Sequence, residues 1–561
     1  MSSITIPVAA SGLVFDDLYR RTGLLRIDQL FVDHLGNADA PLCGQLLSAR
    51  SDPAALTASM ESALLLALAP HVDEFISWLF GIEAEVLALS AGHHELAPLY
   101  SVKRLFVQRK AMHKYKADAA AVIDGAAVGE KLTALFGEPL TELAFAKHVT
   151  TWQQDERGNA DALELALQYA AWAAHTPAGH DRHQAGVLFK SPHKLDVQNL
   201  VPVQTSAVAG YAEHRFDVSR LRQRQGFKLT DKGTDLTGAL DEANYCIWCH
   251  EQGKDSCSKG LKEKGASGRG SKSFKKSPFG ITLAGCPLEE KISEFHKAKT
   301  EGLAIAAIAI ITVDNPMVAA TGHRICNDCM KACIYQKQEP VNIPQAETRT
   351  LKDVLELPWG FEIYSLLTRW NPLNIRQPYP KATSGKRVLV AGMGPAGFSL
   401  AHFLMNDGHT VVGIDGLKIE PLPAELSGVD IAGGRVAFKP IRDVRELYES
   451  LDERAMAGFG GVAEYGITVR WDKNFLKIIR LLLERRSQFA LFGGVRFGGT
   501  ITAEDAFATG FDHIALAIGA GRPTVLDMPN GLARGVRTAS DFLMALQLTG
   551  AAKTDSIANM Q

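Results

Sequence analysis

Apolar residues recur every three or four positions over long stretches of this chain, which is the period of an amphipathic helix. The clearest early example covers residues 52–92, where little strand character is visible. The same spacing returns in residues 286–310 and 350–370. The strongly apolar run 302–313 has twelve residues, too few to cross a bilayer, so we expect a buried helix there.

The pattern changes at residue 386. Residues 386–415, "KRVLVAGMGPAGFSLAHFLMNDGHTVVGID", read as an apolar strand, a glycine-rich turn, a helix and a second strand. Residues 472–486 have helical spacing, and residues 487–497 and 511–520 read as further strands. These alternating elements predict a parallel sheet of the Rossmann type.

The elements predict a multi-domain protein of mixed α and α/β class. We expect a mostly helical domain of unknown role over residues 1–235 and an α-helical domain over 236–372. A proline-rich linker over 373–386 would lead to an incomplete Rossmann-like domain over 387–561.

The glycine-rich turn has the spacing of a dinucleotide fingerprint. Gly392 would make the tight turn, Gly394 would let the backbone approach a pyrophosphate, and Gly397 would allow the helix to pack closely on the strand. The helix N-terminus offers free N–H groups to phosphates. Asp415 ends the second strand, where an acid can bond a ribose hydroxyl.

Two further segments favour a flavin over a nicotinamide. Pro395 and Ala396 lie inside the fingerprint, and the last predicted strand ends in Gly519, Ala520 and Gly521. Glycines at that strand end can bring the backbone close to a flavin.

Seven of the eight cysteines lie between residues 246 and 333. They are Cys246, Cys249, Cys257, Cys286, Cys326, Cys329 and Cys333. Thiolates hold Fe–S clusters or zinc, and two residues between cysteines let one turn present both sulfurs to one centre. Pro287 after Cys286 favours iron, because Cys-Pro ends cluster-binding runs in ferredoxins.

Two four-ligand centres need eight ligands, so one partner would not be a cysteine. Cys43 lies far upstream in a helical pattern, and we interpret it as a small buried thiol. Glu347 is the better candidate, because Pro340 and Pro344 stiffen the chain before it and could return its carboxylate to a cluster.

Other uses of these side chains remain open at this point. Structural zinc with a degenerate flavin domain would make the chain a non-catalytic interaction scaffold, whereas a disulfide framework fits poorly because no secretory signal is present. Histidines such as His93, His94, His180 and His183 could bind metal, but isolated histidines near loops are more often solvated.

From about Asn244 to Phe542 the sequence resembles the glutamate synthase small-subunit family, which includes the N-terminal part of dihydropyrimidine dehydrogenase. Besides the cysteines and the fingerprint, the matching residues are Asn315-Pro316, Gly322, Arg324, Tyr465-Gly466-Ile467 and Ala517 to Ala520. Members join a helical domain with two [4Fe–4S] clusters to an FAD domain. The resemblance therefore implies electron transfer from NAD(P)H through FAD and both clusters to an acceptor.

The resemblance also implies which ligands belong together. One cluster would be held by Cys246, Cys249, Cys257 and Cys333, and the other by Cys286, Cys326, Cys329 and a Gln or Glu at the position of Glu347. No general acid, base or nucleophile is predicted, because the cofactors would carry the chemistry.

Three departures from the family change these expectations. A Gly/Ser/Lys-rich insertion between Cys257 and Cys286 suits a solvated loop or a docking surface, and a second insertion covers about 417–457. After Gly519 no second glycine fingerprint follows. We therefore expect part of a longer or split enzyme, with NAD(P)H bound by a missing segment or subunit, and slow or absent flavin bleaching by NADPH. Rapid bleaching would instead favour a reductase complete in itself.

Composition limits the partners. A hydrophobic fraction of 46% can fill real cores, and a net charge of −2 argues against bulk nucleic-acid binding. We expect a cytoplasmic protein without a membrane anchor, in a reducing compartment, that meets an electron-accepting domain or subunit.

Overall fold

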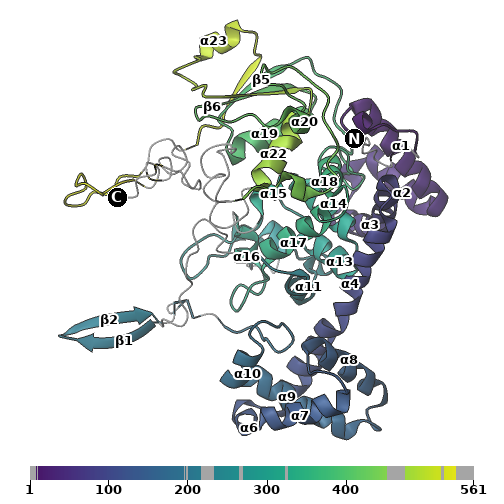
Figure 1. Cartoon of the computed structure of the whole chain (residues 1–561), viewed down its shortest axis with the longest axis vertical. Coiled ribbons are helices and arrows are strands. Elements are labelled where there is room, and N and C mark those ends of the chain that lie inside the picture. The colour runs from purple at the N-terminus through teal and green to yellow at the C-terminus, as the bar shows by residue number, and fades with distance from the viewer. Residues whose placement is uncertain are drawn as a thin grey trace.

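The computed structural model describes residues 8, 11–194, 196–197, 200–201, 203–216, 233–264, 270–322, 326–450, 474–519, 524–538, 542 and 557. Helices dominate up to residue 372, and a parallel sheet follows (Figure 1). The predicted helical N-terminal region and parallel sheet are confirmed.

The first helices lie along one side of the molecule (Figure 1). They are α1 (Arg21–Ala38), α2 (Ala40–Ser51), α3 (Ala58–Phe80) and α4 (Glu83–Val102), with 3-10 turns at Phe15–Leu18 and Pro53–Ala55. Thr57 begins α3 by accepting a hydrogen bond from the Met60 N–H, and Gly81 ends it in the left-handed conformation. Helix α3 packs against α13 and α14 of the cysteine-rich part, so these segments share one core.

A second helical lobe follows α4 through a π-helical segment, η4 (Lys103–Ala111). The lobe contains α5 (Met112–Lys114), α6 (Ala117–Ala121), α7 (Gly125–Phe136), α8 (Glu142–Trp152), a 3-10 turn (Gln153–Asp155), α9 (Ala160–His175) and α10 (Pro177–Arg182). Its core is built around Phe145 and Tyr169 and is separate from the core of α1–α3. The helices of the first 235 residues thus divide between two cores.

A β-hairpin extends from the body of the molecule after the second lobe (Figure 1). Strands β1 (Val203–Val208) and β2 (Tyr211–Phe216) pair antiparallel, and both turn residues, Ala209 and Gly210, have positive φ. That turn geometry matches the twist of the two strands. Helical spacing in this region did not predict it.

The cysteine-rich part is a set of short helices around one apolar helix. They are α11 (Leu236–Tyr245), η7 (Cys249–Gln252), α12 (Ser256–Lys259), α13 (Ile292–Thr300), α14 (Ala304–Asp314), α15 (Val318–Thr321), α16 (Asp328–Ala332), α17 (Ile343–Leu355) and α18 (Gly360–Leu367). Nearly all of α14 is buried, as its apolar run predicted. Within the first insertion, where a solvated loop or docking surface was expected, β3 (Lys262–Lys264) and β4 (Gly270–Phe274) pair as an antiparallel hairpin.

The C-terminal part is a four-stranded parallel sheet in the order β7-β6-β5-β8. Its elements are β5 (Arg387–Ala391), α19 (Pro395–Asn406), β6 (Thr410–Asp415), α20 (Ala424–Ser427), η8 (Val444–Leu447), α22 (Asn474–Glu484), β7 (Phe489–Gly493), α23 (Ala503–Ala508) and β8 (His513–Leu516). Helix α19 packs on β5 and β6 and also contacts α22. Each predicted strand and helix of this part is present.

A buried ion pair ties the three parts together. Arg485, which follows α22, places its Nη1 2.9 Å from Glu362 Oε1 on α18, and neither side chain is exposed. Tyr19 donates a hydrogen bond of 2.6 Å to the other oxygen of Glu362. The backbone of Ile441, from the second insertion, also donates to Glu362. The N-terminal segment, the central helices and the sheet are therefore fixed to one another.

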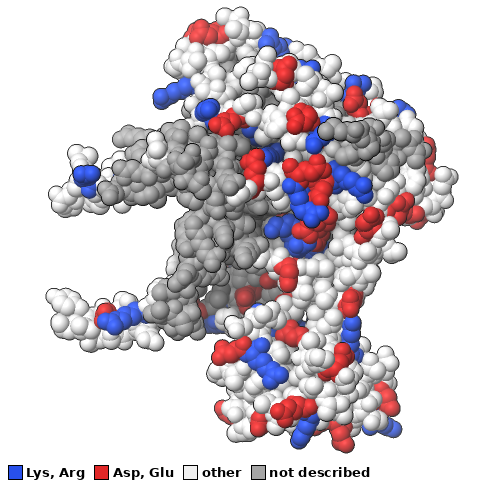
Figure 2. Space-filling model, in the orientation of Figure 1, with Lys and Arg blue, Asp and Glu red and all other residues white. Residues whose placement is uncertain are grey.

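Among the described residues, α3 is the one helix long and apolar enough to cross a membrane by length and composition, and 61% of its most apolar window is buried inside the protein. Acidic and basic side chains are interspersed over the face shown in Figure 2.

Candidate cysteine and nucleotide sites

Four of the cysteines line one cavity. They are Cys246, Cys249, Cys257 and Cys333, each buried, and they share the cavity with Ile247, Ser256, Ile292, His296, Ile334, Tyr335, Val341 and Ile343. Sequence spacing alone could not join Cys333 to the other three. The structure brings these four together as one group.

Helix ends and turns present these sulfurs to the cavity. Cys246 caps the C-terminus of α11, and Cys333 does the same for α16. Between Cys246 and Cys249, Trp248 has a φ of 51°, a left-handed conformation that is uncommon for a bulky residue. That conformation closes the short loop between the two cysteines, and a strained residue of this kind is typical of a functional site.

Burial makes these thiols hard to ionise. It raises the pKa of Cys246 to about 12, and a hydrogen bond from the Trp248 backbone N–H lowers it only in part. Burial also raises the pKa of Cys257 well above its usual range, and nearby Asp255 raises it further. Among the described residues no lysine or arginine lines the cavity, and a bound metal centre would supply the positive charge that stabilises these sulfurs as thiolates. The residues present fit such a group.

The second set of predicted ligands also lies together. Cys329 has three electrostatic neighbours in this set, which are Cys286, Cys326 and Glu347. Burial and these neighbours raise the pKa of Cys329 well above its usual range. Glu347 is buried on α17, and Asn315 Nδ2 donates a hydrogen bond of 3.0 Å to its Oε1. Burial raises the pKa of Glu347 to about 7. Glu347 therefore lies within electrostatic range of Cys286 and Cys329.

Sequence reasoning missed a second buried carboxyl at this site. Glu290 is 5% exposed, is hydrogen-bonded to Glu347, and its pKa is raised well above the usual range by burial and by that neighbour. Two buried carboxyls in contact share a proton unless a cation lies beside them. The only signal in the sequence was its position four residues after Cys286.

The two groups of donors are neighbours. The Cys286 N–H donates a hydrogen bond of 2.8 Å to the Cys257 carbonyl, so one residue of each group meets the other through the backbone. Cys257 is also an electrostatic neighbour of Cys329.

The pairing state of the cysteines and the spacing of their sulfurs bear on two alternatives, a disulfide framework and structural zinc. All eight cysteines belong to the described residues and are unpaired, which contradicts a disulfide framework; Cys43 is buried, as predicted. None of the predicted ligands belongs to a group of three donor atoms within 4.8 Å of one another in the described part of the chain. Sulfurs around one zinc ion at about 2.3 Å lie about 3.8 Å apart. In the described part of the chain, no three of these donor atoms are therefore as close together as around a single zinc ion.

The glycine fingerprint has the packing that its spacing predicted. Gly392 has a φ of 96°, and a Cβ there would lie 2.3 Å from the Ala517 carbonyl oxygen. A Cβ on Gly397 would lie 1.8 Å from the Gly392 carbonyl oxygen. Gly394 caps the N-terminus of α19 without a side chain, and Pro395 and Ala396 form its first turn. Gly394 offers no side-chain cap to the N–H groups at that helix end, which follows the carboxyl end of β5.

Asp415 lies at the end of β6, beside this turn. Its Oδ2 accepts from the Met393 N–H at 2.9 Å, and its Oδ1 accepts from the Leu417 N–H at 2.9 Å. A carboxylate oxygen can accept a second bond, so a ribose hydroxyl remains a possible partner. Gly519 has a φ of 69° and open space around it. Ala520, Gly521, Arg324 and Tyr465 to Ile467 lie outside the described residues.

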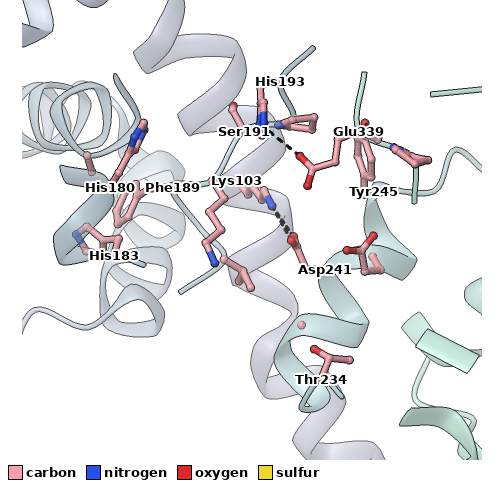
Figure 3. A pocket seen from close by; sticks show the side chains of 17 residues that line it. Lys103, His180, His183, Phe189, Ser191, His193, Thr234, Asp241, Tyr245 and Glu339 are labelled. Carbon is pink, nitrogen blue, oxygen red and sulfur yellow. Dashed lines mark hydrogen bonds and ion pairs between the residues drawn. The ribbon is translucent and has the colours of Figure 1, made fainter. Parts of the chain in front are cut away.

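A larger cavity of about 680 Å³ opens between the second helical lobe and α11 (Figure 3). Lys103 Nζ lies 2.7 Å from both carboxylate oxygens of Asp241 on its wall. Tyr245 also lines this cavity and stacks on Tyr335 with ring centroids 4.6 Å apart. Because Tyr335 lines the cysteine cavity, this aromatic pair connects the two spaces.

Two histidines that were expected to be solvated are not. His93 is 2% exposed and bonds the Leu89 carbonyl within α4. His183 bonds Tyr169 and lies 3.3 Å from Glu142. Both expectations were wrong because His93 lies near Lys299 and Asp353 of the cysteine-rich part and His183 packs inside the second lobe, contacts that local sequence does not reveal.

Comparisons with known proteins agree with two parts of this description. A family model described as the RP005 N-terminal alpha-helical domain matches residues 9–81. The uncharacterized protein RP005 of Rickettsia prowazekii is 33% identical over 290 residues, which cover 50% of this chain and 95% of RP005. The uncharacterized protein RP006 of the same organism is 56% identical over 244 residues, covering 44% of this chain and 33% of RP006.

A glutamate synthase [NADPH] small chain from Mycobacterium tuberculosis is 27% identical over 262 residues, covering 46% of this chain and 42% of that protein. The predicted resemblance is thus a distant homology over less than half of the chain. The chain spans about a third of RP006 and about two fifths of the small chain.

Proposed function

This chain belongs to the family of the uncharacterized protein RP005 of Rickettsia prowazekii, and we propose that it is an oxidoreductase module of a longer or split enzyme. The module relays electrons from NAD(P)H through FAD and two [4Fe–4S] clusters to an acceptor site or partner. Distant homology to a glutamate synthase small chain supports a redox role.

The observation that carries the proposal is the pair of neighbouring donor groups. Cys246, Cys249, Cys257 and Cys333 hold one cluster, and Cys286, Cys326, Cys329 and Glu347 hold the other. The hydrogen bond between Cys286 and Cys257 keeps the two groups adjacent. When bound, such clusters exchange single electrons and FAD exchanges a hydride with a nicotinamide.

The surrounding side chains orient the ligands and exclude water. Ile292, Val341 and Ile343 shield the first group of sulfurs. Asn315 fixes the orientation of Glu347, and Glu290 holds a proton against it. A carboxylate in place of a thiolate, with a protonated neighbour, gives the second cluster a different potential from the first.

The sheet edge binds FAD. The first turn of α19 would receive the pyrophosphate, Asp415 would receive the ribose, and the backbone at Gly519 would approach the flavin. We propose that a further segment or a partner subunit binds NAD(P)H. We place the protein in the cytoplasm, where thiols stay reduced.

The stacked tyrosines would connect the first group of cysteines to an electron acceptor. Tyr335 borders the first group of cysteines, and Tyr245 borders the cavity of Figure 3. An acceptor domain or small acceptor that enters this cavity lies next to the first cluster. The wall there is mixed in charge, with Lys103 and His193 facing Asp241 and Glu339.

The alternative is a zinc-binding scaffold with a degenerate flavin domain. The spacing of the donor atoms and the intact packing of Gly392 and Gly397 favour the redox proposal. Anaerobic purification, followed by iron, sulfide, zinc and flavin analysis, tests it. We expect brown protein with about eight iron and eight sulfide per chain, as two cubanes demand. Colourless protein with zinc on the cysteines would overturn it.

A further inference from the structure

Three side chains with metal-binding groups meet where α1 passes α3. His71 and Glu74 lie three residues apart on α3 and so share one face of that helix, and His34 comes from α1. One donor atom of each lies within 4.8 Å of the other two. His34 Nε2 lies 3.7 Å from Glu74 Oε2.

Two imidazole nitrogens at this place are buried without a hydrogen-bond partner in the described part of the chain. They are His34 Nε2 and His71 Nδ1. A buried polar atom left unsatisfied costs about 1–3 kcal/mol, so native structures seldom hold two side by side. An ion pair between His34 and Glu74 would account for the first nitrogen but not for the second.

The helices that carry these residues are held firmly. Phe31 of α1 and Phe75 of α3 are fully buried and meet edge to face with ring centroids 5.4 Å apart. The ring of His34 lies 5.7 Å from that of Phe75. The donors therefore sit on regular helices whose crossing is fixed by the core, which is the arrangement that a precise metal site needs.

We propose that His34, His71 and Glu74 bind a divalent first-row transition-metal ion of the Zn²⁺ class. Two imidazoles and one carboxylate are ligands that suit such ions, and three protein ligands leave one position for water. The site lies within residues 9–81, the region matched by the RP005 N-terminal alpha-helical domain. It is independent of the cysteine groups and of the proposed redox function.

Bound metal would join α1 to α3. Because the unfolded chain does not hold the three donors together, metal binding stabilises the folded N-terminal helices, and the stabilisation grows with the logarithm of the metal concentration above the dissociation constant. Glu74 is exposed, so the ion can enter from solvent.

Zn²⁺ binding to the purified full-length holoprotein tests the site. We expect one Zn²⁺ per chain at micromolar free Zn²⁺, with iron content unchanged. Zinc-edge X-ray absorption should show nitrogen and oxygen neighbours only, at about 2.0–2.2 Å. Sulfur neighbours at about 2.3 Å, or no bound zinc, would overturn the proposal.

Variants locate the ion. His71→Ala and Glu74→Gln should each weaken Zn²⁺ binding by at least about tenfold, because each removes a direct ligand. Glu74→Gln keeps the shape of an exposed side chain, so we expect this variant to fold even if the His71→Ala variant does not. His113→Ala and Glu85→Gln, at exposed positions outside the group, are the matched controls. Equal affinity in Glu74→Gln and its control Glu85→Gln would assign the zinc elsewhere.

Discussion

Removing Asp353 should destabilise the helices that carry the second group of donors, in a way that depends on pH. Lys299 on α13 and Asp353 on α17 pair with a separation of 2.6 Å, and each side chain is 1% exposed. Arg349 also contacts Asp353, at 2.6 Å. This pair joins the helix that follows Cys286 to the helix that carries Glu347.

The magnitude follows from what Asp353→Asn leaves behind. Breaking a buried pair by removing one partner costs about 3–5 kcal/mol. Deprotonation of Lys299 sets the upper limit of this destabilisation, because a lysine with an ordinary pKa of about 10.4 loses its proton at pH 7 at a cost of about 4.6 kcal/mol. At pH 9 the same step costs about 2 kcal/mol, at about 1.4 kcal/mol per pH unit.

The sign follows from proton binding. Burial lowers the pKa of Lys299, and the charge of Asp353 raises it in part. In Asp353→Asn, Lys299 of the folded protein loses its proton at a lower pH than in the wild type. Between that pH and about 10 the folded variant binds fewer protons than the unfolded chain, so its stability rises with pH in this range. The deficit relative to the wild type should shrink from about 3–5 kcal/mol at pH 7 to about 2 kcal/mol at pH 9.

Hydrogen exchange of peptides that cover α13 and α17 in the full chain measures this change. Lys299→Met should cost less, because Asp353 keeps Arg349 as a partner. Glu156→Gln, which breaks an exposed pair with Lys110, is the control and should change stability by less than about 1 kcal/mol. If Asp353→Asn matches this control, or if its deficit is the same at pH 7 and pH 9, the reasoning is wrong.

Two further outcomes are expected. Gly397→Ala should lower the flavin content, measured by absorbance after gentle purification, at least about tenfold. The added Cβ would lie 1.8 Å from the Gly392 carbonyl oxygen, so the close packing of α19 on β5 would be lost. Gly44→Ala, at a position with open space, is the control, and equal flavin content in both variants would contradict the assignment. Arg485→Met should lower the free energy of unfolding, measured in urea, by about 3–5 kcal/mol, because Glu362 stays buried and loses its cation. Arg445→Met, at the exposed pair with Asp443, should change it by less than about 1 kcal/mol. Similar effects of both variants would show that Arg485 and Glu362 do not form a buried ion pair.

Local pattern predicted the elements of this chain better than their assembly. The strand, turn and helix around Gly392 were readable because the glycine spacing is a local signal, and a Cβ on Gly397 would lie 1.8 Å from the Gly392 carbonyl oxygen of the same turn. The contact between Gly392 and Ala517 was not readable from local sequence. The apolar run of α14 likewise predicted a buried helix. The split of the first 235 residues into two cores was not readable, because α4 runs on into the second lobe without any break in helical spacing.

The candidate site also divides into residues that local sequence predicted and residues that only the assembled fold brings together. Counting ligands pointed to Glu347, which is buried and is an electrostatic neighbour of Cys286 and Cys329. Glu290 was missed, since a glutamate in "PLEEKI" reads as a solvated first turn until the fold buries it. His34 and His71 were missed for a different reason, because residues far apart in sequence become neighbours only when α1 packs against α3.

Iron content of the anaerobically purified Glu347→Ala variant tests the central claim most directly. Two adjacent cubanes, one of them with Glu347 as its eighth-ligand carboxylate, predict that iron falls from about eight to about four per chain, with the signal of the Cys246, Cys249, Cys257 and Cys333 centre retained in Mössbauer spectra. Glu356→Gln on the same segment should keep about eight. Unchanged iron and spectra in Glu347→Ala, or no iron in the wild-type protein, would contradict the claim.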